Sequence, residues 1–172
     1  MKQLCIICMI CLSVIAHAAS PVQGLLERID KGASRKFVIE QVKSETDFFE
    51  LDQKGNKVVV RGNNPVSIAT GVNWYLKYYA GIHLSWNGMT ARLPDILPPV
   101  PKKEHHETNL AHRYDFNYCT FSYTMAFWDW ERWEQEIDWM ALHGINLPLA
   151  MVGIDVVWYN ICLLYTSPSP RD

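Results

Sequence analysis

The stretch of residues 117–153, NYCTFSYTMAFWDWERWEQEIDWMALHGINLPLAMVG, decides the fold. A short strand is predicted just before and into it, over residues 112–117, and a helix over residues 130–143. A second strand is predicted over residues 146–152, where every side chain after the first is apolar, as in a strand covered on both faces. Strand, helix and strand in this order begin a parallel α/β sheet or barrel.

The predicted helix at 130–143 has clear ends. Asp129 is a suitable N-cap and Gly144 a suitable stop. Two faces follow from the 3.6-residue period. One is an apolar stripe expected to be buried, formed by Trp130, Trp133, Ile137, Met140 and Ala141. The other is expected to face solvent, and comprises Glu131, Arg132, Gln135, Glu136 and Asp138.

Residues 20–94 precede this unit and predict a small α+β domain. Asn64 followed by Pro65 marks the start of its longer helix, and Gly81 its end. A turn at residues 54–56 predicts a hairpin, since glycine and asparagine accept positive φ. The expected elements, in chain order, are a helix at 21–31, strands at 36–42, 47–51 and 57–61, a helix at 65–79, and a strand at 82–86.

Residues 95–109 read as a linker stiffened by prolines, and they separate the small domain from the unit at 110–161. His105 and His106 invite a metal interpretation. Adjacent side chains of an extended segment point in opposite directions, however, and no third ligand is spaced nearby. A solvated linker is the favoured interpretation, and we expect neither a metal nor a cofactor.

The two ends of the chain are expected to lie outside the folded part. Residues 1–18 resemble a signal peptide, with Lys2, an apolar run and Ala16-His17-Ala18 before the cleavage point. A membrane anchor is the alternative, although the run is short for a bilayer. Residues 162–172, CLLYTSPSPRD, match the translation of a sequencing adapter. We therefore expect native sequence to stop near Asn160 or Ile161.

Composition narrows the class of protein. Hydrophobic residues make up 49% and charged residues 20% of the chain, which is typical of a globular protein. The net charge of -2 indicates no nucleic-acid partner, and no membrane partner is expected after signal cleavage. Three cysteines would leave with the signal peptide, so Cys119 and Cys162 provide no disulfide framework. The expected location is outside the cytoplasm: periplasm, cell surface or medium.

The candidate site lies where the first strand of the unit ends. Asn117, Cys119 and Tyr123 follow that strand, and in a TIM barrel this end of the strands faces the active site. Asparagine matches a sugar hydroxyl or acetamido group, and a thiol can line a small apolar pocket. The alternative is that these residues only pack the barrel mouth. Met151 to Gly153 are weaker candidates, whereas His143 and Asn146 are expected to be structural, and Trp128 and Trp130 to be packing residues.

No catalytic pair is expected in this chain. A glycosidase needs two facing carboxyl groups, but the dense carboxylates at Glu131, Glu134, Glu136 and Asp138 lie on the expected solvent face of one helix.

Residues 113–151 resemble the opening of the catalytic domain of the α-N-acetylglucosaminidase family of glycoside hydrolases. The matching elements are Arg113-Tyr114, Asn117-x-Cys119-Thr120, Ser122-Tyr123, Trp128-Asp129-Trp130, Arg132-Trp133-Glu134, the run from Glu136 to Leu142, and Gly144-Ile145-Asn146. Residues 20–100 resemble the small N-terminal domain of that family. Pro148 and Met151-Val152 depart from the family pattern, which leaves the detail of substrate choice open.

The resemblance implies the first two β/α units of a truncated (β/α)8 barrel in an exported, exo-acting, retaining enzyme. Such an enzyme removes terminal α-linked N-acetylglucosamine from glycans and uses two glutamates, which the resemblance places beyond the end of this chain. It also implies that Asn117 and Cys119 line the sugar pocket. The chain itself is then expected to be inactive. The rival is a non-catalytic carbohydrate-binding or surface-interaction protein, and a third option is a barrel glycosidase of another specificity.

Overall fold

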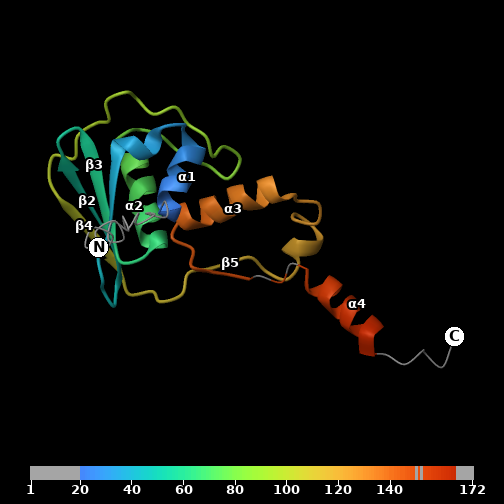
Figure 1. The fold of residues 1–172 in the computed structure, drawn as a ribbon. Coiled ribbons are helices and arrows are strands. Elements are labelled where there is room, and N and C mark those ends of the chain that lie inside the picture. Colours follow the sequence, from blue (N-terminus) through green and yellow to red (C-terminus); the bar gives the residue numbers. More distant parts are fainter. Residues whose placement is uncertain (1–19, 150, 152, 166–172) are drawn as a thin grey trace, which may run out of the picture.

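The computed structural model describes residues 20–149, 151 and 153–165. The predicted signal peptide therefore lies outside the described residues. Two parts follow each other along the chain (Figure 1). A four-stranded sheet with two helices on one side forms the N-terminal unit, and a third helix with a two-stranded sheet follows it.

The N-terminal sheet has the order β1-β3-β2-β4. β1 (Phe37–Gln41) pairs parallel with β3 (Lys57–Gly62), while β2 (Asp47–Lys54) pairs antiparallel with β3 and with β4 (Glu104–Thr108). The predicted hairpin is confirmed, and Gly55 in its turn has φ of 60°. This positive φ explains why glycine stands there.

α1 (Pro21–Ile29) and α2 (Pro65–Tyr78) cover one face of this sheet (Figure 1). The Asn64 side chain accepts a hydrogen bond from the Ser67 backbone, which confirms the predicted N-cap. Gly81, with φ of 66°, follows the helix end as expected. Both helices bury the apolar positions that their spacing predicts, namely Val22, Leu25, Leu26 and Ile29 of α1 and Ile68, Val72, Tyr75 and Leu76 of α2.

Two predictions for residues 79–109 are wrong. Residues 82–86 form no strand, and Ser85 makes only an isolated antiparallel bridge to Gly88. Residues 95–109 are not a free linker, since Leu97 and Val100 are buried in the core and β4 extends the sheet. Tyr75 Oη also donates a 2.6 Å hydrogen bond to the Pro98 carbonyl, which ties this segment to α2.

His105 and His106 do point in opposite directions on β4, as argued from the extended backbone. Their rings are not simply solvated, however. His105 stacks on Phe48 with ring centroids 5.3 Å apart, and His106 stacks on Phe49 at 4.9 Å. Adjacent residues of β2 present these two phenylalanines to opposite faces of the sheet.

The second part contains a parallel two-stranded ladder, and it contacts the N-terminal unit through a helix. β5 (Tyr114–Asp115) pairs parallel with β6 (Leu147–Pro148), and α3 (Trp130–Leu142) connects them. α3 packs beside α2, where Asn73 Nδ2 donates a 3.1 Å hydrogen bond to the Leu142 carbonyl. The strand–helix–strand order is confirmed, although both strands are shorter than predicted, and residues 150 and 152 lie outside the described part.

α4 (Ile154–Tyr165) projects away from the rest of the chain (Figure 1). It continues past Ile161, into the segment assigned to an adapter. Helix formation there does not identify the origin of these residues, so that assignment stays a prediction.

Candidate functional site

The segment after β5 makes a tight turn that begins with an unusual backbone. Phe116 has φ of 71°, which is the one positive value at a non-glycine position among the described residues. A bulky side chain adopts this conformation only at an energetic cost, so the surroundings must hold it. The Asp115 carboxylate accepts a 2.7 Å hydrogen bond from the Phe116 backbone amide and helps to fix the turn.

Asn117 and Cys119 lie in this turn and are exposed. Asn117 Oδ1 accepts a 2.9 Å hydrogen bond from the Cys119 backbone amide, and the Asn117 carbonyl accepts one of 2.7 Å from Thr120 Oγ1. Both of these hydrogen bonds use oxygen atoms of Asn117, and neither uses its side-chain amide donors. Tyr123, 79% exposed, follows the short 3-10 helix Thr120–Ser122. The structure brings Asn117 and Cys119 together, whereas Tyr123 is linked to them only through the backbone of Thr120.

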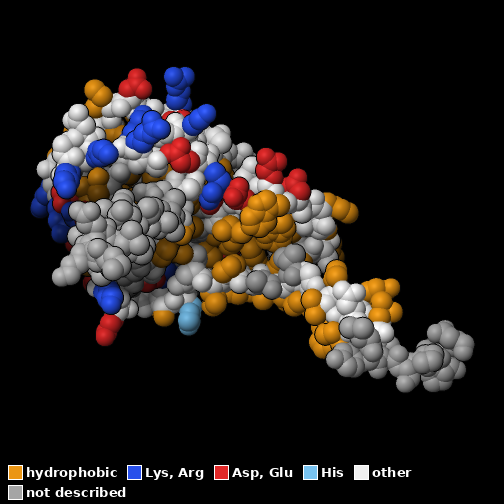
Figure 2. All heavy atoms as spheres, viewed as in Figure 1, with side chains coloured by type: hydrophobic (Ala, Val, Ile, Leu, Met, Phe, Trp, Pro, Cys, Tyr) orange, Lys and Arg blue, Asp and Glu red, His pale blue; other side chains and the backbone are white. Residues whose placement is uncertain are grey.

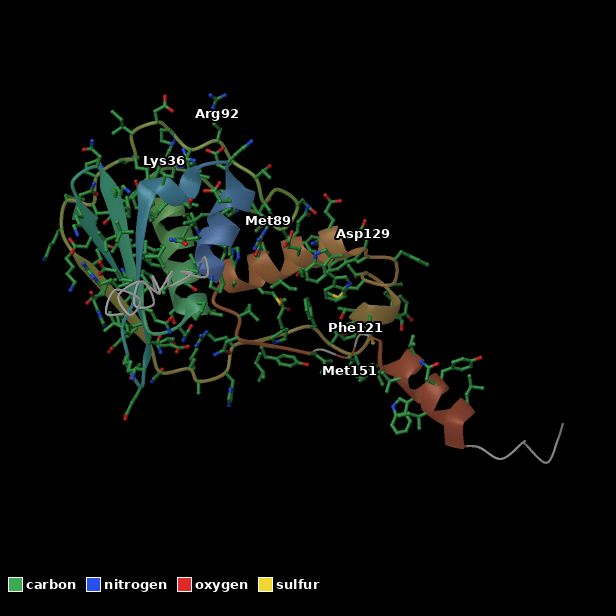
Figure 3. The ribbon with its side chains drawn as sticks, in the orientation of Figure 1. Lys36, Met89, Arg92, Phe121, Asp129 and Met151 are labelled. Atoms are coloured by element: carbon green, nitrogen blue, oxygen red, sulfur yellow. The ribbon has the colours of Figure 1, made fainter. Side chains whose placement is uncertain are left out.

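The other residues considered in the sequence differ in where the structure places them. Asn146 is structural as expected, because it accepts a 2.9 Å hydrogen bond from the Arg113 amide and donates one to the Ala111 carbonyl. His143 lies at the end of α3, where its Nδ1 is 2.8 Å from the Trp139 carbonyl. Met151 and Gly153 are exposed beyond β6, and Figure 3 shows Met151 on the same side of α3 as Phe121.

An aromatic cluster lies between this turn and α3. Trp133 stacks on Phe121 and meets Phe116 edge-on, both with ring centroids 6.4 Å apart. Trp128 contacts Trp133 at 5.2 Å. Trp128 is therefore a packing residue as predicted, but Trp130 is 69% exposed and its predicted burial is wrong.

Two residues of the predicted solvent face of α3 are buried, contrary to the sequence prediction, whereas Glu131 and Gln135 of that face are exposed and Met140 of the predicted buried stripe is buried, as expected. Glu136 is 2% exposed and Asp138 is 8% exposed, whereas Ile137 of the supposed buried stripe is 46% exposed. The cause is the N-terminal unit, which supplies partners for both carboxylates. Trp86 Nε1 donates a 2.7 Å hydrogen bond to Glu136, and Arg28 donates two to Asp138 at 2.5 and 2.7 Å.

Arg132 completes the contact around Glu136. Its Nη2 donates a 2.9 Å hydrogen bond to Glu136, and its guanidinium lies 4.8 Å from the Trp86 ring centroid and 4.0 Å from that of Trp128. Sequence reasoning placed Arg132 in solvent and assigned Trp86 to a strand. Arginine between tryptophans is a recognisable cation–π pattern, but nothing in the sequence indicated that Trp86 would reach α3.

Two charged groups outside the turn also join the two parts. The hydrogen bond to Asp138 raises the pKa of the Arg28 guanidinium. Burial by itself would raise the pKa of Asp47, but hydrogen bonds from Asn63, Arg113 and Asn64 outweigh it and hold this pKa below its usual value. Arg113, just before β5, thus connects the second part to the start of β2 through a 2.6 Å contact with Asp47.

Comparisons with known proteins decide the family. The α-N-acetylglucosaminidase N-terminal domain matches residues 20–99, and the α-N-acetylglucosaminidase tim-barrel domain matches residues 113–167. The chain belongs to the α-N-acetylglucosaminidase family of glycoside hydrolases. The second match reaches into the segment assigned to an adapter.

Individual relatives agree with this assignment. The chain is 39% identical over 155 residues to human α-N-acetylglucosaminidase, which covers 86% of this chain and 21% of the human protein. It is similar to a family 89 glycoside hydrolase from Clostridium perfringens, solved in complex with PUGNAc, with 35% identity and a TM-score of 0.79. That match covers 85% of this chain and 17% of the Clostridium chain. A structure of the Clostridium enzyme with its substrate GlcNAc-α-1,4-galactose matches with a TM-score of 0.78.

The chain thus spans about a fifth of the length of the curated relative that it matches. Within the described residues, no helix is long and apolar enough to cross a membrane, and no group of three or more His, Cys, Asp or Glu side chains is placed to hold a metal.

Proposed function

We propose that this chain is the opening part of an exported, exo-acting, retaining enzyme that hydrolyses terminal α-linked N-acetylglucosamine from glycans. The observation that carries the proposal is the order of the two family matches, N-terminal domain and then barrel domain, along one chain. The relatives are glycoside hydrolases, and one was solved with a substrate that carries terminal α-linked N-acetylglucosamine.

The second part is then the first two β/α units of a (β/α)8 barrel. The parallel β5–β6 ladder with α3 between its strands supports this, because that is the repeating unit of such a barrel. The exposed apolar side chains support it as well. Figure 2 shows hydrophobic side chains over α3 and along α4, and those of Tyr114, Trp130, Ile137, Leu147 and Trp158 are between 44% and 69% exposed. The later strands of the barrel would cover them.

In this proposal Asn117, Cys119 and Tyr123 contribute to the sugar pocket. The turn follows the C-terminal end of β5, the end at which barrel enzymes bind substrate. Its side chains are exposed, and Asn117 retains two amide donors for a hydroxyl or acetamido oxygen. Both catalytic glutamates would come from later strands, so the 172-residue chain alone is expected to be inactive.

Export is proposed from residues 1–18, whose sequence has the parts of a signal peptide. Cleavage after Ala18 would release a chain that begins one residue before the first described position, Ser20. Mass spectrometry of the protein from the periplasm or medium tests this, because an N-terminus at Ala19 is expected and an intact Met1 would contradict export by this signal.

The proposed function is tested by sequencing the uninterrupted gene and assaying its product. Its sequence beyond Asn160 is read, and the encoded protein is assayed with a chromogenic α-N-acetylglucosaminide and with the β-anomer as control. Release from the α-anomer alone supports the proposal. A gene that truly ends at Asp172, or a full-length protein that releases no sugar, overturns it, and sugar binding by the short protein becomes the question.

A further inference from the structure

Glu136 is a carboxylate buried on the side of α3 that faces the N-terminal unit. It is 2% exposed, and it accepts hydrogen bonds from Trp86 Nε1 at 2.7 Å and Arg132 Nη2 at 2.9 Å. Burying a carboxylate is unfavourable unless it is paired and hydrogen-bonded. An apolar residue would pack this contact without that requirement, so the carboxylate specifies a particular arrangement of Trp86 and Arg132.

Arg132 turns this arrangement into a contact between two distant segments. Its guanidinium lies near the rings of both Trp86, in the loop after α2, and Trp128, in the loop before α3. The two rings are themselves 6.3 Å apart between centroids. Glu136 accepts a hydrogen bond from Arg132 while the two rings lie near the guanidinium, so a shift of Trp128 would disturb its contacts with Arg132 and Trp86.

The contact continues to the turn after β5. Trp128 meets Trp133 at 5.2 Å, and Trp133 meets Phe116 and Phe121 at 6.4 Å. These two phenylalanines flank Asn117 and Cys119 in the sequence. Phe116 carries the positive φ, a conformation that persists only where neighbouring groups enforce it.

We propose that Glu136 and Arg132 are positioning residues that, together with Trp86, hold the turn at residues 116–122 in place through Trp128 and Trp133. The N-terminal unit then contributes to the shape of the pocket without touching the sugar. The link to substrate binding rests on the proposed function, because it requires that this turn lines the sugar pocket. The positioning of the turn itself does not depend on the proposed function.

Amide hydrogen exchange measures the positioning directly, in the protein that the uninterrupted gene encodes. The amides of Cys119 and Thr120 are hydrogen-bonded within the turn, so their exchange reports its opening. In Glu136→Gln and in Arg132→Lys we expect exchange there to be faster by about tenfold, the factor that a lost charged hydrogen bond corresponds to. Amides of β1, β2 and β3 keep their rates. Glu131→Gln, the same chemical change at an exposed position of α3, leaves both regions unchanged.

If Glu136→Gln raises amide exchange in the sheet as well, that variant has damaged the fold. The exchange rates of Arg132→Lys then decide whether the turn is held in place by this contact. That variant keeps the charge but removes the planar group that contacts both tryptophans. Unchanged exchange in the turn of Arg132→Lys overturns the proposal.

Kinetics with the α-N-acetylglucosaminide separate positioning from general damage. For Arg132→Lys we expect KM to rise about tenfold while kcat stays within about threefold, because a displaced pocket weakens ground-state and transition-state binding alike. A fall in active fraction would lower kcat and leave KM unchanged, and that result would contradict the role in binding. If the wild-type protein releases no sugar, the proposed function is wrong, and the exchange experiment still decides whether the turn is positioned by Arg132.

Discussion

Gly71 and Gly24 should respond in opposite ways to replacement by alanine. Both lie inside helices, Gly71 in α2 and Gly24 in α1, and neither has a positive φ. In a helix interior alanine is favoured over glycine by about 0.5–1 kcal/mol. The surroundings of the added Cβ therefore decide the sign of the change in the free energy of unfolding.

A Cβ on Gly71 would lie 2.8 Å from Val60 Cγ1 and 3.1 Å from both Cβ and Cδ2 of Phe49. Carbon atoms prefer about 3.5–4.0 Å, so α2 or the sheet has to move by roughly 0.7 Å at the closest contact. Val60 is β-branched and Phe49 is contacted at its Cβ, so neither can rotate away. Overpacking of this kind costs about 1–3 kcal/mol. After the helix preference is subtracted the range is about 0–2.5 kcal/mol, and Gly71→Ala should destabilise by roughly 1 kcal/mol, near the middle of that range.

Gly24→Ala is the matched control. Its Cβ would meet only Arg28 Nη1, at 3.4 Å and on a long side chain, so the helix preference dominates. The variant should be stabilised by about 0.5 kcal/mol or more. Thermal unfolding of the chain from Ser20, followed by circular dichroism, should show a lower midpoint for Gly71→Ala and a higher one for Gly24→Ala. A midpoint for Gly71→Ala at or above the wild-type value would refute the close packing of α2 on β3.

Three further predictions concern the contact between the two parts and the turn. Asp138→Ala should destabilise the fold by about 1–3 kcal/mol in denaturant unfolding, because it leaves Arg28 without its two hydrogen bonds to this carboxylate. Glu134 is the control, since it lies 3.6 Å from the same guanidinium and is more exposed. Glu134→Ala should cost less than about 0.5 kcal/mol. The folded pKa of Asp47 is depressed, so its stabilising contribution is complete above the unfolded value of about 3.9 and is lost as pH falls below it. The wild-type chain should therefore lose more stability on acidification than Asp47→Asn, and equal losses would contradict the role of this carboxylate. In the full-length protein, Cys119→Ala should leave KM for the N-acetylglucosaminide within about threefold while Cys119→Phe raises it by about tenfold or more, and equal KM values would remove Cys119 from the pocket.

Local signals in the sequence predicted much of the N-terminal unit correctly. Asn64 with Pro65 located the start of α2, Gly55 the hairpin turn, and the spacing of Val22, Leu25 and Ile29 the buried side of α1. These features depend on a few neighbouring residues, so one sequence contains the necessary information. β4 was missed because its pairing depends on β2, more than fifty residues away, and its charged residues suit an edge strand as well as a linker.

The candidate site was predictable only in part. The end of β5 places Asn117 and Cys119 in one exposed turn, as the strand assignment implied. The positive φ of Phe116 was not predictable, because nothing local favours it in a phenylalanine. The Phe116 ring contacts those of Trp133 and Phe121, and the position of Trp133 depends on how α3 packs.

The burial of Glu136 and Asp138 shows why periodicity alone did not predict the partners of α3. Helical spacing separates an apolar stripe from a charged one, but it does not say which stripe meets which neighbour. In this structure two members of the charged set meet the N-terminal unit, where Arg28 and Trp86 provide donors for Asp138 and Glu136, while Glu131 and Gln135 stay exposed. Of the apolar stripe, Met140 is buried as predicted, whereas Trp130 and Ile137 stay exposed. Helical spacing therefore does not identify the charged residues that a neighbouring unit will bury, and the two buried carboxylates of α3 mark a polar contact with the N-terminal unit rather than a solvated face.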